Sequence, residues 1–185
     1  EVLSNLGGKH HLEGYDFCAT EHCRAYGGYS ERAASTDEAV RTTRGDVIIA
    51  QGRLVPTVFS ANCGGWTESN ENVWSAPPNP ALRGVPDLPA GKRPKTACLE
   101  SGVLKQWLTS RPPAYCAATQ GTFRWTRRFS TKEITELVNR KYPVGTVRAI
   151  ELGERGVSGR LKSVKVVGSK KTQLVQKELN IRLAF

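Results

Sequence analysis

The sequence contains no methionine, only three histidines and no long hydrophobic run. No apolar stretch approaches the roughly 20 residues of a membrane-spanning helix, so we predict no transmembrane segment. Hydrophobic residues make up 38% and charged residues 24% of the 185 residues, and the mean hydropathy is -0.42. This composition excludes wholesale disorder, and the length suits one full-sized core without a disulfide framework. Because the chain lacks methionine and opens with Glu1, we interpret it as a mature form, a processed piece or a fragment.

Acidic residues are scarce in the second half of the chain. Residues 1–92 carry 8 basic and 11 acidic side chains, whereas residues 93–185 carry 19 basic and 6 acidic ones. A basic half of this size attracts a polyanion. The candidates are a nucleic acid, an anionic lipid surface and an acidic cell-wall polymer. A solvated basic surface without a dedicated ligand is the simpler alternative.

All three histidines lie beside two of the five cysteines, within residues 10–23. Zinc prefers four tetrahedral ligands of the thiolate and imidazole types, and the best set of four is His11, Cys18, His22 and Cys23. Four protein ligands leave no open position for water, so this zinc site would be structural. The spacing matches no common zinc finger, and a small disulfide loop or a group of unrelated polar residues remains an alternative.

The other three cysteines are Cys63, Cys98 and Cys116. One disulfide between Cys98 and Cys116 would suit an oxidising compartment and would leave Cys63 single. From the sequence, Cys63 is a thiol near the candidate site, a bridge partner or a buried filler. In a reducing compartment all three would be thiols.

The order of predicted elements is that of an α+β protein with mainly antiparallel sheets, a few short helices and long Pro/Gly-rich loops. We predict helices over 37–43, 104–108 and 131–142, the last from a capping box at Ser130 and Glu133. A hairpin is predicted over 47–60, and an antiparallel pair over 147–152 and 161–167. Residues 172–175 add a third strand, and residues 177–185 form a short helix or an apolar strand. The proline-rich stretch 75–94 is an extended surface connection.

Residues 60–74 form the segment with the densest candidate chemistry. A glycine pair directly after a strand lets a ligand approach backbone N–H groups closely, and tryptophan rings offer flat faces on which sugars stack. The alternatives are a strained turn with two core tryptophans, and glutamates that serve as a cap or a surface charge. We predict Glu68 and Glu71 as catalytic or groove-lining carboxylates. The predicted substrate-binding residues are Ser60, Cys63, Gly64, Gly65, Trp66, Thr67, Asn70 and Trp74.

Several segments together resemble the stage II sporulation protein D family, also called the amidase-enhancer domain. The matching segments are 18–28, 39–45, 60–74, 123–125, 155–160 and Ile181-Arg182, so the resemblance extends over nearly all of the chain. It implies a single domain over 1–185, with a subdomain at 95–145 following the proline-rich stretch.

The resemblance implies an exported protein of the cell envelope that acts on peptidoglycan glycan strands, either as a lytic transglycosylase or as a helper of a cell-wall amidase. It also implies zinc in the early His and Cys segment. In the family the catalytic acid is a glutamate in a helical segment before the early Cys/His motif. Nothing in residues 1–5 matches that segment. A transglycosylase can work with a single carboxylate, because a sugar hydroxyl replaces water as nucleophile.

Three functional classes therefore stay open at this point. They are a peptidoglycan-cleaving enzyme that needs its upstream segment, a non-catalytic glycan-binding module that stimulates an amidase, and a nucleic-acid binder. The basic residues form no recognisable helix-turn-helix or aromatic RNA-binding signature, which argues against the third class.

Overall fold

The computed structural model describes residues 10–20, 23, 25–29, 32–55, 57–74, 76–93, 103–118 and 121–185. The chain divides into two compact units, Glu1–Phe59 and Ser60–Phe185. This division falls at a different place from the predicted subdomain at 95–145, and the single-domain organisation stays a prediction. Within the described residues, no helix combines the length and the apolar character needed to cross a membrane.

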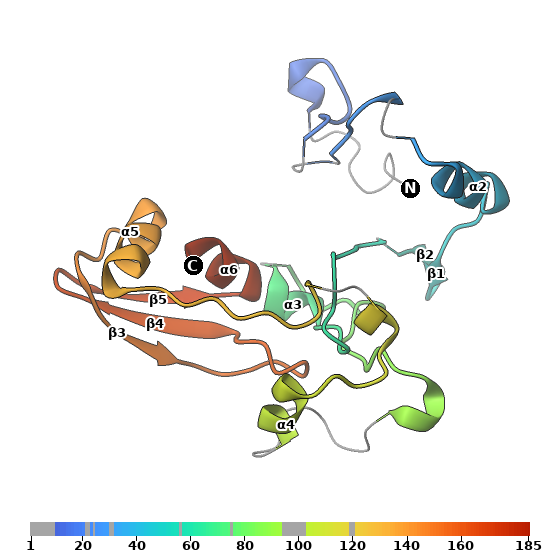
Figure 1. The fold of residues 1–185 in the computed structure, drawn as a ribbon. Helices are drawn as coiled ribbons and strands as arrows, with labels where there is room; N and C mark the ends of the chain where they lie inside the picture. The colour runs from blue at the N-terminus through green and yellow to red at the C-terminus, as the bar shows by residue number, and fades with distance from the viewer. Residues whose placement is uncertain are drawn as a thin grey trace. The chain divides into compact units, whose positions relative to one another are not determined.

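Unit 1 contains a one-turn helix η1 (His11–Glu13), the helix α2 (Ala34–Thr42) and a small hairpin of β1 (Ile49–Ala50) and β2 (Arg53–Leu54). Figure 1 shows these elements in blue and teal. None of the described residues of this unit is buried, and the side chains of Leu12 and Tyr29 are 89% and 75% exposed. The hairpin prediction is confirmed, with strands of only two residues each.

Helix α2 begins at Ala34, three residues before the predicted start. The Thr36 hydroxyl turns back to the main chain of Ala33, accepting from its N–H and donating to its carbonyl. Alanine has the strongest helix propensity, so the segment before Asp37 extends the helix instead of staying outside it. Thr36 therefore supports the helix from inside its first turn.

Unit 2 is built on a three-stranded antiparallel sheet in the order β3 (Val147–Leu152), β4 (Ser163–Gly168) and β5 (Thr172–Gln176). Helix α5 (Thr131–Lys141) and helix α6 (Glu178–Ala184) pack on one face of it (Figure 1). The α+β prediction is confirmed, and of the two alternatives for residues 177–185 the helix is observed. Ser130 caps α5 with the predicted capping box, in which its hydroxyl accepts from Glu133 N.

The main core lies between the sheet and the two helices. Its buried members are all valines, Val138, Val144, Val147, Val164, Val166 and Val175. Side chains alternate between the faces of a strand, so Val164 and Val166 point to the helices while Lys165 points away. The opposite face of the sheet, which carries Lys165 and its strand partner Leu174, is open, with Leu174 52% exposed.

The first part of unit 2 contains α3 (Asn70–Val73), η3 (Ala90–Lys92), α4 (Val103–Thr109) and η4 (Tyr115–Ala118). A smaller core of Leu88, Ala114 and Phe123 lies here, with Trp107 packed against it. The described part of the proline-rich stretch is extended, as predicted, apart from η3 and a turn at 79–82. It is not purely a surface connection, because Leu88 is buried in the small core. It runs antiparallel to the segment after the glycine pair, since Trp66 pairs with Pro86 and Thr67 N donates to Val85 O at 2.9 Å.

Candidate functional site

The glycine pair of the 60–74 segment forms a tight turn that only glycine adopts readily. Gly64 has φ 66° and Gly65 has φ 90°, both in the left-handed region. A Cβ at Gly65 would lie 2.9 Å from the Trp107 ring and 3.2 Å from Ala114 Cβ. The turn is therefore pressed against the small core, which explains the second glycine as a packing requirement.

Two arginines from distant parts of the chain hold the carbonyls of this turn. Arg160 donates to Cys63 O at 2.6 Å and to Trp66 O at 2.9 Å. Arg124 donates to Gly64 O at 3.0 Å. Cys63 O also accepts from Trp66 N at 3.4 Å, and the two guanidinium groups supply further donors to the carbonyls of the turn.

Trp66 is a core residue in this structure, which agrees with the core alternative and not with the prediction of a sugar-stacking ring. It is 7% exposed and meets Trp107 edge to face, with ring centroids 5.9 Å apart. A ring covered in this way has no face available for sugar stacking. Trp74 follows α3 and is half-buried.

Glu68 is held by four hydrogen-bond donors. Its Oε1 accepts from Ser69 N and Asn72 Nδ2, both at 2.9 Å, and its Oε2 accepts from Ser158 N at 3.2 Å and Ser158 Oγ at 2.5 Å. A Cβ at Gly156 would overlap the same carboxylate. Glu68 thereby joins the start of α3 to the loop 155–160, and these contacts favour a structural role over the predicted catalytic one.

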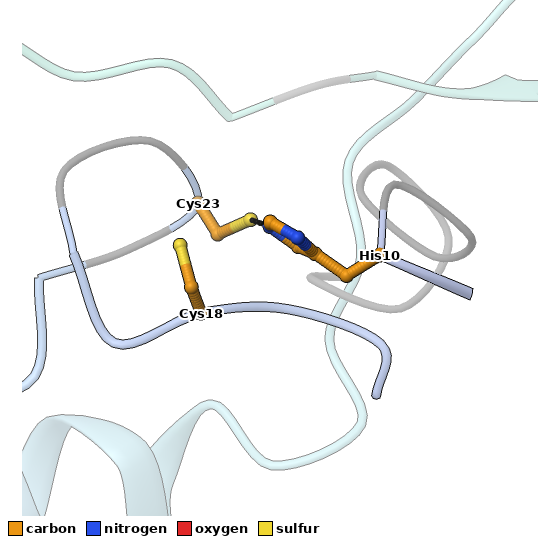
Figure 2. Close-up of side chains that lie close together, drawn as sticks. All are labelled: His10, Cys18 and Cys23. Carbon is orange, nitrogen blue, oxygen red and sulfur yellow. Dashed lines mark hydrogen bonds between the residues drawn. The ribbon is translucent and has the colours of Figure 1, made fainter. Parts of the chain in front are cut away.

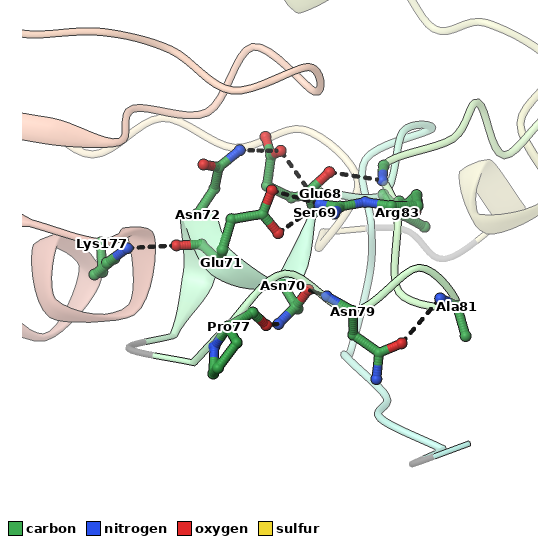
Figure 3. Close-up of polar contacts among 12 residues, drawn as sticks. Glu68, Ser69, Asn70, Glu71, Asn72, Pro77, Asn79, Ala81, Arg83 and Lys177 are labelled. Atoms are coloured by element: carbon green, nitrogen blue, oxygen red, sulfur yellow. Dashed lines mark hydrogen bonds and ion pairs between the residues drawn. The ribbon is translucent and has the colours of Figure 1, made fainter. Parts of the chain in front are cut away.

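Glu71 forms an ion pair with Arg83 and its main-chain oxygen accepts from Lys177 Nζ at 2.6 Å (Figure 3). The hydrogen bond from Arg83 holds the pKa of the Glu71 carboxyl below its usual range. The side chain thus stays ionised at neutral pH and does not serve as a proton donor there. Catalysis by Glu68 and Glu71 stays a prediction.

A polar cavity of about 390 Å³ lies where α3 meets the ends of the sheet strands. It is lined by Glu71, Asn72, Gly153, Glu154, Lys162, Ser163, Gln176 and Lys177. Lys162 Nζ lies 2.8 Å from Glu154 Oε2, the Glu71 carboxylate is paired with Arg83, and Lys177 Nζ donates to the main-chain oxygen of Glu71. Lys177 has φ 74°, a strained conformation of the kind that clusters at ligand sites.

Two other predicted binding residues support the local fold. Asn70 is buried, with its amide donating to Pro77 O at 2.7 Å and its carbonyl accepting from Asn79 N at 2.8 Å (Figure 3). Thr67 Oγ1 accepts from Val85 N at 2.8 Å. Ser60, at the start of the unit, is exposed. Of the predicted residues of this segment, only Glu71 lines the cavity.

Cys63 forms a compact cluster with Cys116 and Asp87. The two Sγ atoms lie 3.3 Å apart, and the Cys63 thiol donates to Asp87 Oδ2 at 3.2 Å. Burial, followed by the contact with Cys116, raises the pKa of the Cys63 thiol to about 12. Cys116 is a thiol in this structure. Its predicted partner Cys98 lies outside the described residues.

In unit 1 the structure brings together His10, Cys18 and Cys23 (Figure 2). Their ligand atoms all lie within 4.8 Å of one another, and His10 Nε2 is 3.3 Å from Cys23 Sγ. The other ring nitrogen of His10 contacts the Glu13 carboxylate, which raises the pKa of His10. A carboxylate behind a ligating histidine is a common device for orienting the ring toward a metal.

This group differs from the predicted ligand set in one histidine. His11 lies at the first position of η1 and is exposed, and it does not belong to the group that the structure gathers. His22 lies outside the described residues. The two cysteines are those predicted from the sequence.

Comparison with known families divides the chain in two. Residues 68–185, well over half of the chain, match the model described as a domain of unknown function, DUF8618. The chain belongs to the DUF8618 family. Residues 2–49 match the model described as Stage II sporulation protein. The resemblance to that family is therefore confirmed, and the match covers the first quarter of the chain instead of nearly all of it.

Two curated relatives match about as much of the chain as the Stage II sporulation protein model does. The amidase enhancer of Bacillus subtilis (strain 168) is 40% identical over 53 residues, which are 29% of this chain and 7% of that protein. An uncharacterized protein of Brachyspira hyodysenteriae is 37% identical over 60 residues, which are 32% of this chain and 16% of the relative. The chain spans less than a fifth of either relative. No solved structure matches it.

The two candidate sites thus lie in segments that match different family models. The His10 group lies in the sporulation-protein segment, whereas the cavity and Glu68 lie in the DUF8618 segment. Sequence reasoning missed Ser158, Arg160 and Lys177. The motif 155–160, with glycines beside its serine and arginines, was the available signal for the first two.

Proposed function

We propose that this chain is part of a protein of the bacterial cell envelope that binds peptidoglycan glycan strands and assists a cell-wall amidase. The match of residues 2–49 to the Stage II sporulation protein model and the similarity to an amidase enhancer support a cell-wall function. The proposed role of the DUF8618 segment is binding, not bond cleavage. The observation that carries this choice is that the carboxylates of Glu68 and Glu71 are both bound by internal donors.

The cavity between α3 and the sheet is our candidate for a sugar subsite. Its volume falls in the range of about 300–1,000 Å³ that is usual for small-ligand sites. Amide, hydroxyl, ammonium and carboxylate groups line it, and these are the partners that sugar hydroxyl and acetamido groups require. Because two acidic and two basic side chains line it, the lining has no net formal charge and suits an uncharged polar ligand such as an N-acetylated sugar.

The test is a pull-down of the full chain with peptide-stripped glycan strands, with product analysis by mass spectrometry. The double variant Lys162→Ala/Gln176→Ala, in the cavity, is expected to bind about tenfold more weakly, which corresponds to about 1.4 kcal/mol. The control is Lys165→Ala/Gln173→Ala. Each double variant removes one lysine that is ion-paired with a glutamate, Glu154 or Glu151, and one glutamine of β5, so the change in net charge is equal.

Equal losses in both double variants would mean that simple charge attraction holds the glycan, and would remove the cavity from the proposal. Anhydro-muramyl products from this chain would overturn the binding-only role and return Glu68 and Glu71 to the catalytic class. Binding to duplex DNA with a steep salt dependence, and none to glycan, would favour the nucleic-acid class instead.

We also propose that His10, Cys18 and Cys23 are three of the four ligands of a structural zinc ion. Two thiolates and one imidazole are ligands that zinc prefers, and they lie close enough together to share one ion. Bound zinc would fix the segment 10–23, in which none of the described residues is buried.

Zinc content per chain, measured by mass spectrometry after dialysis, tests this site. His10→Ala and Cys18→Ser are expected to lose most of the metal, whereas His11→Ala keeps it. If instead the His11→Ala variant lost its zinc and the His10→Ala variant kept it, the result would support the ligand set predicted from the sequence. A wild-type chain that holds no zinc after refolding with it would contradict both sets.

A further inference from the structure

We infer that Cys63 and Cys116 become joined by a disulfide bond in the protein's working state. Their sulfur atoms lie 3.3 Å apart across the contact between the glycine turn and η4. They are 53 positions apart in sequence, so the bond would close a long loop through the small core of unit 2. This inference rests on the geometry of unit 2 and does not require the proposed function.

Both cysteines are held in place by contacts of their own backbones. Cys63 O accepts from Arg160 Nη2 at 2.6 Å. Cys116 O accepts from Asn62 Nδ2 at 2.9 Å, and Cys116 N donates to Asp87 Oδ2 at 3.2 Å. Two thiols fixed at contact distance have a very high effective concentration, which favours the intramolecular bond over exchange with outside thiols.

The polar neighbours of the two sulfurs suit the two steps of thiol–disulfide exchange. Gly65 N donates to Cys116 Sγ at 3.2 Å and so stabilises negative charge on it. The Cys116 thiol would lose its proton to solvent and, as the thiolate, attack one sulfur of a disulfide donor such as glutathione disulfide or a protein disulfide, which breaks the donor S–S bond and releases one thiolate. Cys63, losing its proton to Asp87 Oδ2, would then displace the second thiolate. Two thiols are oxidised to one disulfide, and the donor disulfide is reduced to two thiols.

A metal ion on the same three residues fits the geometry less well. Tetrahedral zinc with Zn–S bonds of about 2.3 Å would hold two sulfurs about 3.8 Å apart, and here they are closer. Each sulfur also already has a hydrogen-bond partner within the cluster. The guanidinium groups of Arg160 and Arg124, bound to the same turn, repel a further cation.

The experiment uses the full chain equilibrated in a buffer of reduced and oxidised glutathione, followed by acid quenching, alkylation and peptide mapping. Cleavage after Lys and Arg places Cys63, Cys98 and Cys116 in three different peptides, so the pairing can be read directly. We expect a linked pair of the Cys63 and Cys116 peptides as the main oxidised species. Cys63→Ser is expected to abolish it, and Cys98→Ser, which removes the partner predicted from the sequence, is expected to leave it intact.

Three outcomes would overturn the inference. A linked pair of the Cys98 and Cys116 peptides would support the pairing predicted from the sequence. Full alkylation of both thiols after oxidation would show that no bond forms. Thiols that resist alkylation until a chelator, and not a reductant, is added would show a metal site.

A stability readout checks that the bond forms in the native fold. Reduction of the wild type is expected to lower Tm by about 8 °C, because a long closed loop is released. Cys116→Ser is expected to show no such response to reductant. An unchanged wild-type Tm after reduction would contradict a native cross-link even if the linked peptides were found.

Discussion

Replacing Glu68 with alanine is expected to destabilise unit 2 by about 3 kcal/mol. The change removes the acceptor of four donors, and Ser158, whose N–H and hydroxyl both lose their partner, is only 6% exposed. A buried donor left without a partner costs about 1–3 kcal/mol. All four tryptophans lie in residues 60–185, so denaturant unfolding followed by tryptophan fluorescence reports this unit alone.

Two further variants separate the structural from the catalytic role of Glu68. Glu68→Gln keeps the shape and one oxygen acceptor, so it should lose about half as much stability as Glu68→Ala. Glu71→Ala breaks a more exposed ion pair and should lose much less. Wild-type stability in Glu68→Ala, with loss of glycan cleavage in Glu68→Gln, would show that the carboxylate serves chemistry and not the fold.

Local sequence signals predicted the C-terminal half of unit 2 well. The capping box at Ser130 and Glu133 marks the start of α5 to the residue. Alternation in 147–152 and 161–167 marks two strands, because one face of the sheet is packed under helices and the other is open. These signals act within one turn of helix or along one strand, so they can be recognised without the rest of the fold.

The candidate site depends on contacts that no local pattern contains. Glu68 and Ser158 are 90 positions apart, and Arg160 reaches carbonyls more than 90 positions before it. In the sequence, glutamates flanked by tryptophans are typical of a catalytic groove. In the fold, however, Ser158 binds the Glu68 carboxylate and Arg83 binds the Glu71 carboxylate. The choice between His10 and His11 likewise depends on the direction of each ring at the start of a short helical turn, which spacing does not define.

The same contacts change the interpretation of the basic half of the chain. Arg124 and Arg160 donate to turn carbonyls, and Lys162 and Lys165 are paired with Glu154 and Glu151. Part of the positive charge therefore has an internal structural use. An excess of basic residues in this sequence is a weaker argument for a polyanionic ligand than the count alone suggests.

Replacing Gly65 with alanine is expected to destabilise unit 2 by about 3 kcal/mol, the second large effect. Alanine in the left-handed region costs about 1–2 kcal/mol, and forcing a methyl group into a packed core costs a further 1–3 kcal/mol. Both penalties apply here, since Gly65 has φ 90° and its Cβ would meet the Trp107 ring at 2.9 Å. The displaced ring should also shift the fluorescence of the native state.

Gly64→Ala is the matched control one residue earlier in the same turn. Its φ of 66° carries the same backbone penalty, but its Cβ would lie 3.4 Å from Arg124 Nη1, an ordinary contact. We expect a loss of about 1 kcal/mol and an unchanged native spectrum. Equal losses in the two variants would mean that the turn yields to the methyl group, and that Gly65 is present for its backbone conformation and not for the close approach to Trp107.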